Sequence, residues 1–256
     1  MHAEDYERCL EYLYSLQKFG IKFGLSATAH LLDRLGNPHR NLNFIHIAGS
    51  NGKGSVGAMI SSILTEAGYR VGYYTSPHLV DFTERFRIND HDVSKERILQ
   101  IFNEVRKHVV DKEPPTFFEM VTAMALLYFA QEEVDWAIME VGMGGRLDAT
   151  NIIEPKISLI TSLSLEHKEF LGSTLTAIAR EKAGIIKKGV PVVTGVKQPS
   201  ALAVIKARCS ALGCKLWQYK KNFRVRKRRR GVFDYYGHEW RLKNLELPLI
   251  GDHQIY

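Results

Sequence analysis

The sequence contains no hydrophobic run long enough to cross a lipid bilayer. Its longest apolar stretch, Met120–Ala130, falls well short of the roughly 20 residues that a spanning helix needs. The N-terminal segment is acidic and amphipathic, with no basic region followed by an apolar one, so no secretory signal is recognisable. We therefore expect a cytoplasmic protein without a membrane partner.

Cysteine is also scarce, because the 256 residues include only Cys9, Cys209 and Cys214. An odd number of cysteines argues against a disulfide framework, and their spacing lacks the pairs of a structural zinc site. We expect three free thiols in a reducing compartment.

Acidic residues are too few to balance the basic ones, and the imbalance is local. The net charge is +7, and the run Lys220–Arg230 alone holds eight basic residues, so removing those eight charges leaves −1 for the rest. Within this run Arg224 and Arg226 alternate with apolar residues, and Gly231 precedes a second alternating stretch over 232–242. The pattern predicts a two-stranded ribbon with a solvated face. An anionic partner for the run remains the alternative.

Apolar segments of strand length alternate with segments of helical periodicity through most of the chain. Helical spacing covers Glu4–Phe19 and Ala27–Leu35. Strands are predicted near 43–48, 70–75, 135–141, 156–161 and 190–195, and helices near 54–67, 94–110, 117–131, 174–187 and 199–212. The alternation predicts an α/β fold with a mostly parallel sheet flanked by helices. After Cys214, short alternating segments predict a small β-rich edge near the C-terminus.

The most informative segment is the glycine-rich loop AGSNGKGS at Ala48–Ser55. It stands between a predicted strand and a predicted helix, where backbone N–H groups and a helix N-terminus bind phosphate. Glycines let the backbone approach the anion, a lysine adds a positive charge, and a serine hydroxyl can bind magnesium. The loop is shorter than the generic phosphate loop. Its predicted ATP-binding residues are Asn51, Gly52, Lys53, Gly54 and Ser55.

Four later segments accompany this loop, and they are Tyr74–Asp90 (YTSPHLVDFTERFRIND), Thr116–Leu126 (TFFEMVTAMAL), Glu140–Asn151 (EVGMGGRLDATN) and Leu165–Gly189 (LEHKEFLGSTLTAIAREKAGIIKKG). With GSNGKGS they resemble, in order, the motifs of the folylpolyglutamate synthase/dihydrofolate synthase family of the Mur ligase superfamily. Several matches across about 150 residues are far more specific than one glycine-rich loop. The resemblance implies a P-loop, Mur-ligase-like central domain.

The resemblance also implies a domain organisation. Residues 1–256 are expected to form the N-terminal Mur-ligase-type ATP-binding domain, and the family's C-terminal glutamate-ligase domain is expected to be absent from this chain. In such ligases domain closure brings the acyl phosphate and the amine together and excludes water. We therefore expect the isolated domain to be inactive.

The implied activity is an ATP-dependent acid–amino-acid ligase that adds L-glutamate to a folate or dihydropteroate carboxylate through an acyl phosphate. The residues do not distinguish dihydrofolate synthase from folylpolyglutamate synthase, or from an enzyme that does both. We expect a monomer with small-molecule substrates and no nucleic-acid partner. Two alternatives remain, namely another Mur-type amino-acid ligase and a nucleic-acid-binding P-loop ATPase suggested by the basic run.

The resemblance further implies ATP and two Mg²⁺ ions as cofactors, with metal ligands at Ser55, Ser76, Glu140, His167 and Lys182. Lys182 is expected to be carbamylated, because an ammonium repels a cation whereas a carbamate supplies hard oxygen ligands. The implied catalytic residues are Lys53, His167 and Lys182. Without the resemblance, His167 is interpreted as a surface or capping histidine and Lys182 as a solvated lysine on an amphipathic helix.

A pterin ring needs aromatic or apolar walls and a few hydrogen-bonding groups. By resemblance, the substrate-binding residues are Gly24, Leu25, Thr116, Phe118, Leu147, Asp148 and Ala149. Phe118 is expected to form a wall, and Asp148 is expected to supply hydrogen bonds.

Overall fold

The computed structural model describes residues 3–20, 22, 24–110 and 112–255. Its main sheet has eight strands in the order β4-β3-β2-β5-β1-β6-β7-β8. The strands are β1 (Asn43–Ala48), β2 (Val71–Tyr74), β3 (Phe86–Ile88), β4 (His91–Asp92), β5 (Trp136–Glu140), β6 (Pro155–Ile160), β7 (Val192–Thr194) and β8 (Leu216–Gln218). All neighbours pair in parallel except β2 with β3 and β3 with β4. The expected α/β fold with a mostly parallel sheet is confirmed.

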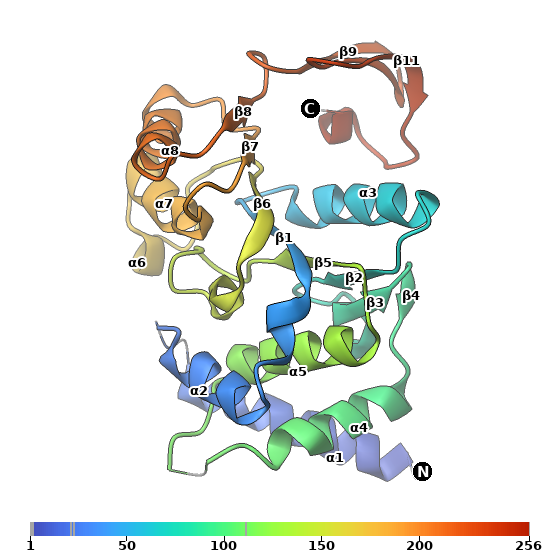
Figure 1. Cartoon of the computed structure of the whole chain (residues 1–256), viewed down its shortest axis with the longest axis vertical. Helices are drawn as coiled ribbons and strands as arrows, with labels where there is room; N and C mark the ends of the chain where they lie inside the picture. Colours follow the sequence, from blue (N-terminus) through green and yellow to red (C-terminus); the bar gives the residue numbers. More distant parts are fainter. Residues whose placement is uncertain (1–2, 21, 23, 111, 256) are drawn as a thin grey trace.

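Helices cover both faces of this sheet (Figure 1). They are α1 (Ala3–Ser15), α2 (Ser26–Arg34), α3 (Lys53–Glu66), α4 (Lys95–Arg106), α5 (Phe117–Gln131), α6 (Lys168–Leu171), α7 (Leu175–Lys182) and α8 (Pro199–Ala211). Short 3₁₀ helices are η1 (Leu16–Phe19), η2 (Pro38–Asn41), η3 (Phe82–Arg85), η4 (Ala149–Ile152), η5 (Ala183–Ile185) and η6 (Asp252–Ile255). None of the helices in the described ranges is long and apolar enough to cross a membrane.

Helix α5 lies at the centre of the hydrophobic core on one face of the main sheet. A capping box fixes its start, because the Thr116 N–H donates to Glu119 and the Glu119 N–H donates back to the Thr116 hydroxyl. From Met120 to Phe129 every residue is buried, between the sheet on one side and α1, α2 and α4 on the other. A helix that is apolar all round needs this central position. The opposite face of the sheet packs against α3.

A second, antiparallel sheet follows β8 and has the order β11-β10-β9. Its strands are β9 (Arg224–Arg229), β10 (Val232–Tyr236) and β11 (Arg241–Glu246). The small β-rich edge is confirmed, but the two-stranded ribbon is wrong. The stretch 232–242 does not form one strand, because the backbone turns at Gly237, whose N–H donates to the Trp240 carbonyl.

Candidate active site at the carboxyl ends of the parallel strands

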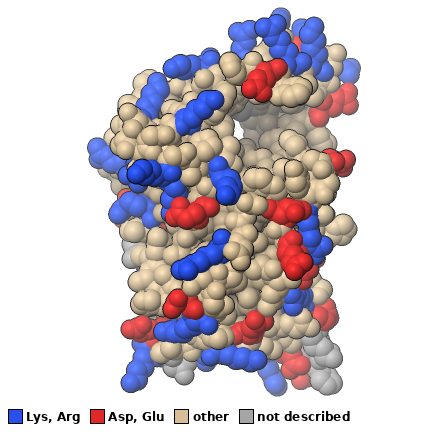
Figure 2. Space-filling view, in the orientation of Figure 1, with Lys and Arg blue, Asp and Glu red and all other residues tan. Residues whose placement is uncertain are grey.

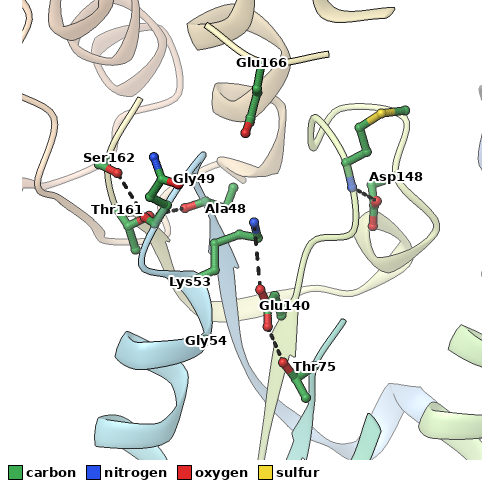
Figure 3. Close-up of polar contacts among 12 residues, drawn as sticks. Ala48, Gly49, Lys53, Gly54, Thr75, Glu140, Asp148, Thr161, Ser162 and Glu166 are labelled. Carbon is green, nitrogen blue, oxygen red and sulfur yellow. Dashed lines mark hydrogen bonds and ion pairs between the residues drawn. The ribbon is translucent and has the colours of Figure 1, made fainter. Parts of the chain in front are cut away.

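The carboxyl ends of the central strands meet at one edge of the main sheet (Figure 3). β1 leads into the glycine-rich loop, β5 ends at Glu140, Thr75 follows β2, and Thr161 follows β6. Ligands of open α/β sheets bind at this edge. The strand order therefore places the loop, a carboxylate and two hydroxyls in one region.

The glycine-rich loop is held by the strand beside it. The hydroxyls of Thr161 and Ser162 donate to the Asn51 carbonyl at 2.8 and 3.0 Å. Gly49 has φ +154°, and a Cβ there would lie 1.8 Å from the Thr161 Oγ1. Gly52 has φ +83° and caps α3, which begins at Lys53. The loop thus presents the N-terminus of a 14-residue helix to the strand ends.

Glu140 is a buried carboxylate with polar neighbours. The Thr75 hydroxyl donates to its Oε2 at 2.5 Å, and the Lys53 Nζ lies 3.8 Å from its Oε1. Burial raises the pKa of Glu140, although the Thr75 hydrogen bond and the Lys53 charge oppose that effect. A cation near this carboxylate would favour its charged form.

The donor set at this edge suits magnesium. Within the described ranges, no group of three or more His, Cys, Asp or Glu side chains could hold a metal ion. Magnesium, however, binds through one or two carboxylates and otherwise keeps waters and substrate phosphates. The Glu140 carboxylate and the hydroxyls of Thr75 and Ser55 are oxygen donors of this hard type.

Lys182 is almost completely buried, so its interpretation as a solvated lysine is wrong. Its Nζ donates to the Gly49 carbonyl at 2.9 Å and lies 2.7 Å from Glu166 Oε1. Burial lowers the pKa of Lys182, and the hydrogen bond and charge of Glu166 oppose that shift. The last turn of α7 is therefore attached to the glycine-rich loop.

His167 is placed differently from the other proposed metal ligands. It is exposed, has φ +43° and precedes α6 without a side-chain capping bond. In the described part of the chain no hydrogen bond or ion pair links it to Glu140 or Lys182. Its role at a metal stays a prediction.

A cavity of about 310 Å³, here called the aromatic cavity, opens beside Ser76 and the start of α5. Its lining includes six of the seven predicted substrate residues: Gly24, Thr116, Phe118, Leu147, Asp148 and Ala149. Leu25 does not line it. Phe118 forms a wall against Gly142, where a Cβ would lie 2.5 Å from the ring. Residues distant in sequence thus meet around one cavity.

Asp148 holds the loop that closes this cavity. Its oxygens accept hydrogen bonds from the Met143 N–H at 2.9 Å, the Thr150 N–H at 3.0 Å and the Thr150 hydroxyl at 2.5 Å. Burial raises the pKa of Asp148, and the Thr150 hydroxyl opposes the shift. Most of the hydrogen-bond acceptor capacity of Asp148 is used within the chain, so this side chain mainly fixes the conformation of the loop.

Arg85 is a cavity residue that the sequence analysis missed. It is 7% exposed, its Nε donates to His78 Nδ1 at 2.8 Å, and its guanidinium lies 5.3 Å from the Phe117 ring centroid. No acidic side chain in the described ranges forms an ion pair with it. Nothing in the local pattern TERFRI distinguishes this arginine from a solvated one.

A second cavity of about 660 Å³, here called the loop cavity, adjoins the glycine-rich loop. Asn51, Gly52 and Ser55 line it, together with Tyr219 and Phe223 from the segment after β8. His253 and Gln254 also line this cavity. The sequence analysis missed these C-terminal residues because only the folded chain brings them to the loop.

This chain is similar to known proteins both in sequence and in structure. The Mur ligase middle domain family matches residues 47–256. A dihydrofolate synthase/folylpolyglutamate synthase from Bacillus subtilis is 45% identical over 207 residues, covering 78% of this chain and 48% of that protein. The crystal structure of a folylpolyglutamate synthase from Thermotoga maritima has a TM-score of 0.91 and 41% identity, covering 100% of this chain and 60% of that one. An FPGS–AMPPCP–folate complex has a TM-score of 0.91 and 37% identity, covering 98% and 63%. The chain thus spans about half to three fifths of these relatives.

Proposed function

Because this chain belongs to the Mur ligase family, in the branch of the folylpolyglutamate and dihydrofolate synthases, we propose that it uses ATP to join L-glutamate to a carboxylate of a folate or of dihydropteroate. One observation carries the proposal. The glycine-rich loop and the Lys53–Glu140 pair lie at the same sheet edge as the aromatic cavity, which the implied substrate residues line. The relative solved with AMPPCP and folate supports the same pair of ligands.

The chemistry requires activation, because a free carboxylate is a poor acyl donor. Its oxygen attacks the γ-phosphorus of ATP, the bond to the bridging oxygen breaks, and ADP leaves. The glutamate amine then attacks the acyl carbon, the bond to the phosphate oxygen breaks, and inorganic phosphate leaves while solvent takes the amine proton. These steps need positioning and charge neutralisation more than a side-chain nucleophile.

Different residues of this chain bind the phosphates, the metal ion, the heteroaromatic ring and the nucleoside in this proposal. Lys53 and the N-terminus of α3 hold the phosphates. Glu140, with the hydroxyls of Thr75 and Ser55, would hold Mg²⁺, which neutralises phosphate charge when bound. Phe118 provides a flat wall for a heteroaromatic ring. The loop cavity is the proposed place of the nucleoside, because it adjoins the same loop and has aromatic sides.

Lys182 is the residue that we propose to be carbamylated. Its burial and lowered pKa support the proposal, because a neutral amine is the form that reacts with carbon dioxide. A carbamate would place negative charge beside the Glu166 carboxylate and the Gly49 carbonyl, which now receive the ammonium. Carbamylation therefore requires a cation to bind in the same place or Glu166 to move away.

A substrate panel tests the function. The full-length protein is incubated with ATP, L-glutamate and either dihydropteroate or tetrahydrofolate, and folylglutamate products are measured by mass spectrometry. We expect product with at least one acceptor, and its loss in Glu140→Gln. Glu169→Gln removes an exposed carboxylate on α6 and serves as the matched control. Glutamylation of neither acceptor, with ligation of another amino acid to a different carboxylate, would favour the alternative of another Mur-type ligase.

A further inference from the structure

The three-stranded sheet has one face that the proposed ligase function does not use. The strand register sets Arg224 opposite Tyr236, and Tyr236 opposite Arg241. Directly opposed residues share a face of an antiparallel sheet, and so do alternate residues of one strand. Arg226 belongs to the same face, and Arg228 is brought there by its ion pair with Asp234. We call Arg224, Arg226, Arg228, Tyr236 and Arg241 the basic face.

The other side of this sheet is turned toward the rest of the molecule. Lys227 pairs with Asp252 of η6, and the Phe223 ring, which lines the loop cavity, lies 6.5 Å from that of Tyr235. Along β9, Arg224 and Arg226 are exposed whereas Val225 and Lys227 are partly buried. Figure 2 shows lysine and arginine side chains gathered over β9–β11 at one end of the molecule. The basic face therefore lies on the side of this sheet that points away from the loop cavity.

Most of the charge on this face has no acidic partner. Asp234 accepts hydrogen bonds from the Arg228 Nε at 2.7 Å and the Tyr236 hydroxyl at 3.1 Å. Glu246, which the register sets opposite Val232 on the same face, forms an ion pair with Arg229. Among the residues that the structure describes, none forms an ion pair with Arg224, Arg226 or Arg241. Like charges repel, so gathering several unpaired arginines on one face is unfavourable. Contact with solvent alone would not require this clustering of positive charge.

An aromatic ring, that of Tyr236, lies among these cations. The Arg224 guanidinium is 5.2 Å from the centroid of the Tyr236 ring, and Trp240, in the turn before Arg241, is 67% exposed. Arginine planes and exposed aromatic rings on a β-sheet are the surfaces on which unpaired bases stack. All four cations of the basic face are arginines, which bind phosphate in bidentate geometry.

We propose that the basic face binds single-stranded nucleic acid, with phosphates on the arginines and a base on Tyr236. An acidic peptide would be served equally well by lysine and would need no rings. A membrane surface would need more exposed apolar side chains than Trp240 and Leu242 supply. The proposal departs from our expectation of no nucleic-acid partner, because the register gathers the arginines around Tyr236 on one face.

The test is fluorescence anisotropy of the full-length protein with a labelled 20-nucleotide single-stranded RNA, between 50 and 200 mM salt. The variant R224S/R226S/R241S removes the three unpaired charges, and K156S/K206S/R208S removes three exposed charges elsewhere. We expect the first variant to bind at least ten-fold more weakly than the wild type. The salt slope, which is the slope of log K for RNA binding against log salt concentration, should decrease in magnitude by about 2, since each phosphate contact on a single strand contributes about 0.7. The control variant should bind like the wild type, and ligase turnover should be unchanged in both.

Tyr236→Leu tests stacking separately, with an expected loss of about five-fold or more and an unchanged salt slope. No binding at 50 mM salt would overturn the proposal, as would equal losses in the two triple variants. Equal or tighter binding of labelled poly-L-glutamate, or of anionic vesicles, would assign the face to another class of partner. If Tyr236→Leu fails to fold, the triple variants and their salt slopes still decide.

Discussion

Gly49→Ala should destabilise the protein, and the cause can be separated into two parts. The methyl group would lie 1.8 Å from the Thr161 Oγ1, and φ +154° is strained for any residue with a Cβ. The strain costs about 1–3 kcal/mol. Turning the Thr161 side chain away removes its 2.8 Å hydrogen bond to the Asn51 carbonyl, at a cost of about 1 kcal/mol. We expect the free energy of unfolding to fall by about 3 kcal/mol.

A double-mutant cycle measured by urea unfolding checks this account. Thr161→Ala alone should cost about 1 kcal/mol or less, because the Ser162 hydroxyl still donates to Asn51. The double variant should lose about 1–2 kcal/mol less than the sum of the two single variants, since the closest overlap is gone. Gly54→Ala is the control, because its Cβ meets nothing nearer than 3.9 Å. Additive losses, or a Gly49→Ala protein as stable as the wild type, would refute the reasoning.

Glu140→Gln should reduce turnover about 100-fold or more, yet raise stability at neutral pH. Because burial raises the pKa of Glu140 in the folded state, wild-type stability falls as pH rises through that pKa, and urea unfolding should show the two proteins converging toward pH 4. Glu166→Gln should cost about 3 kcal/mol by leaving the Lys182 ammonium buried without its acid, and adding Lys182→Met should restore most of it. This loss should shrink at high pH, because the pKa of Lys182 is lowered by burial and deprotonation relieves the cost. Arg85→Met should raise the KM for the folate or pteroate substrate about ten-fold or more while the KM for ATP stays unchanged. Arg87→Met, which removes a partly exposed arginine paired with an aspartate, should change neither constant in steady-state assays.

Local patterns made part of this structure predictable. The strand before the glycine-rich loop and the helix after it are each continuous in sequence, so β1 and α3 lie within one residue of their predicted bounds. The Glu140 carboxylate could be placed at a strand end for the same reason. The antiparallel strands β3 and β4 were missed, because three-residue and two-residue strands leave almost no periodicity to detect.

Side-chain environments were less predictable than elements. Lys182 lies on a helix whose pattern is amphipathic, and only the folded chain shows that the glycine-rich loop and Glu166 cover it. The environment of Arg85 was equally unpredictable, because its neighbours His78 and Phe117 come from a loop and a distant helix. Amino-acid periodicity describes which face is apolar, whereas the partner of a buried charge is decided by tertiary contacts.

The two hydroxyls on the Asn51 carbonyl have a consequence for ligand-binding thermodynamics. In a trans peptide the C=O and the following N–H point in opposite directions, so holding the Asn51 carbonyl against Thr161 and Ser162 turns the Gly52 N–H away from β6. The loop backbone therefore reaches this orientation when the protein folds, and its conformational entropy is lost then. Calorimetry of polyphosphate binding should show little entropic penalty from ordering the loop.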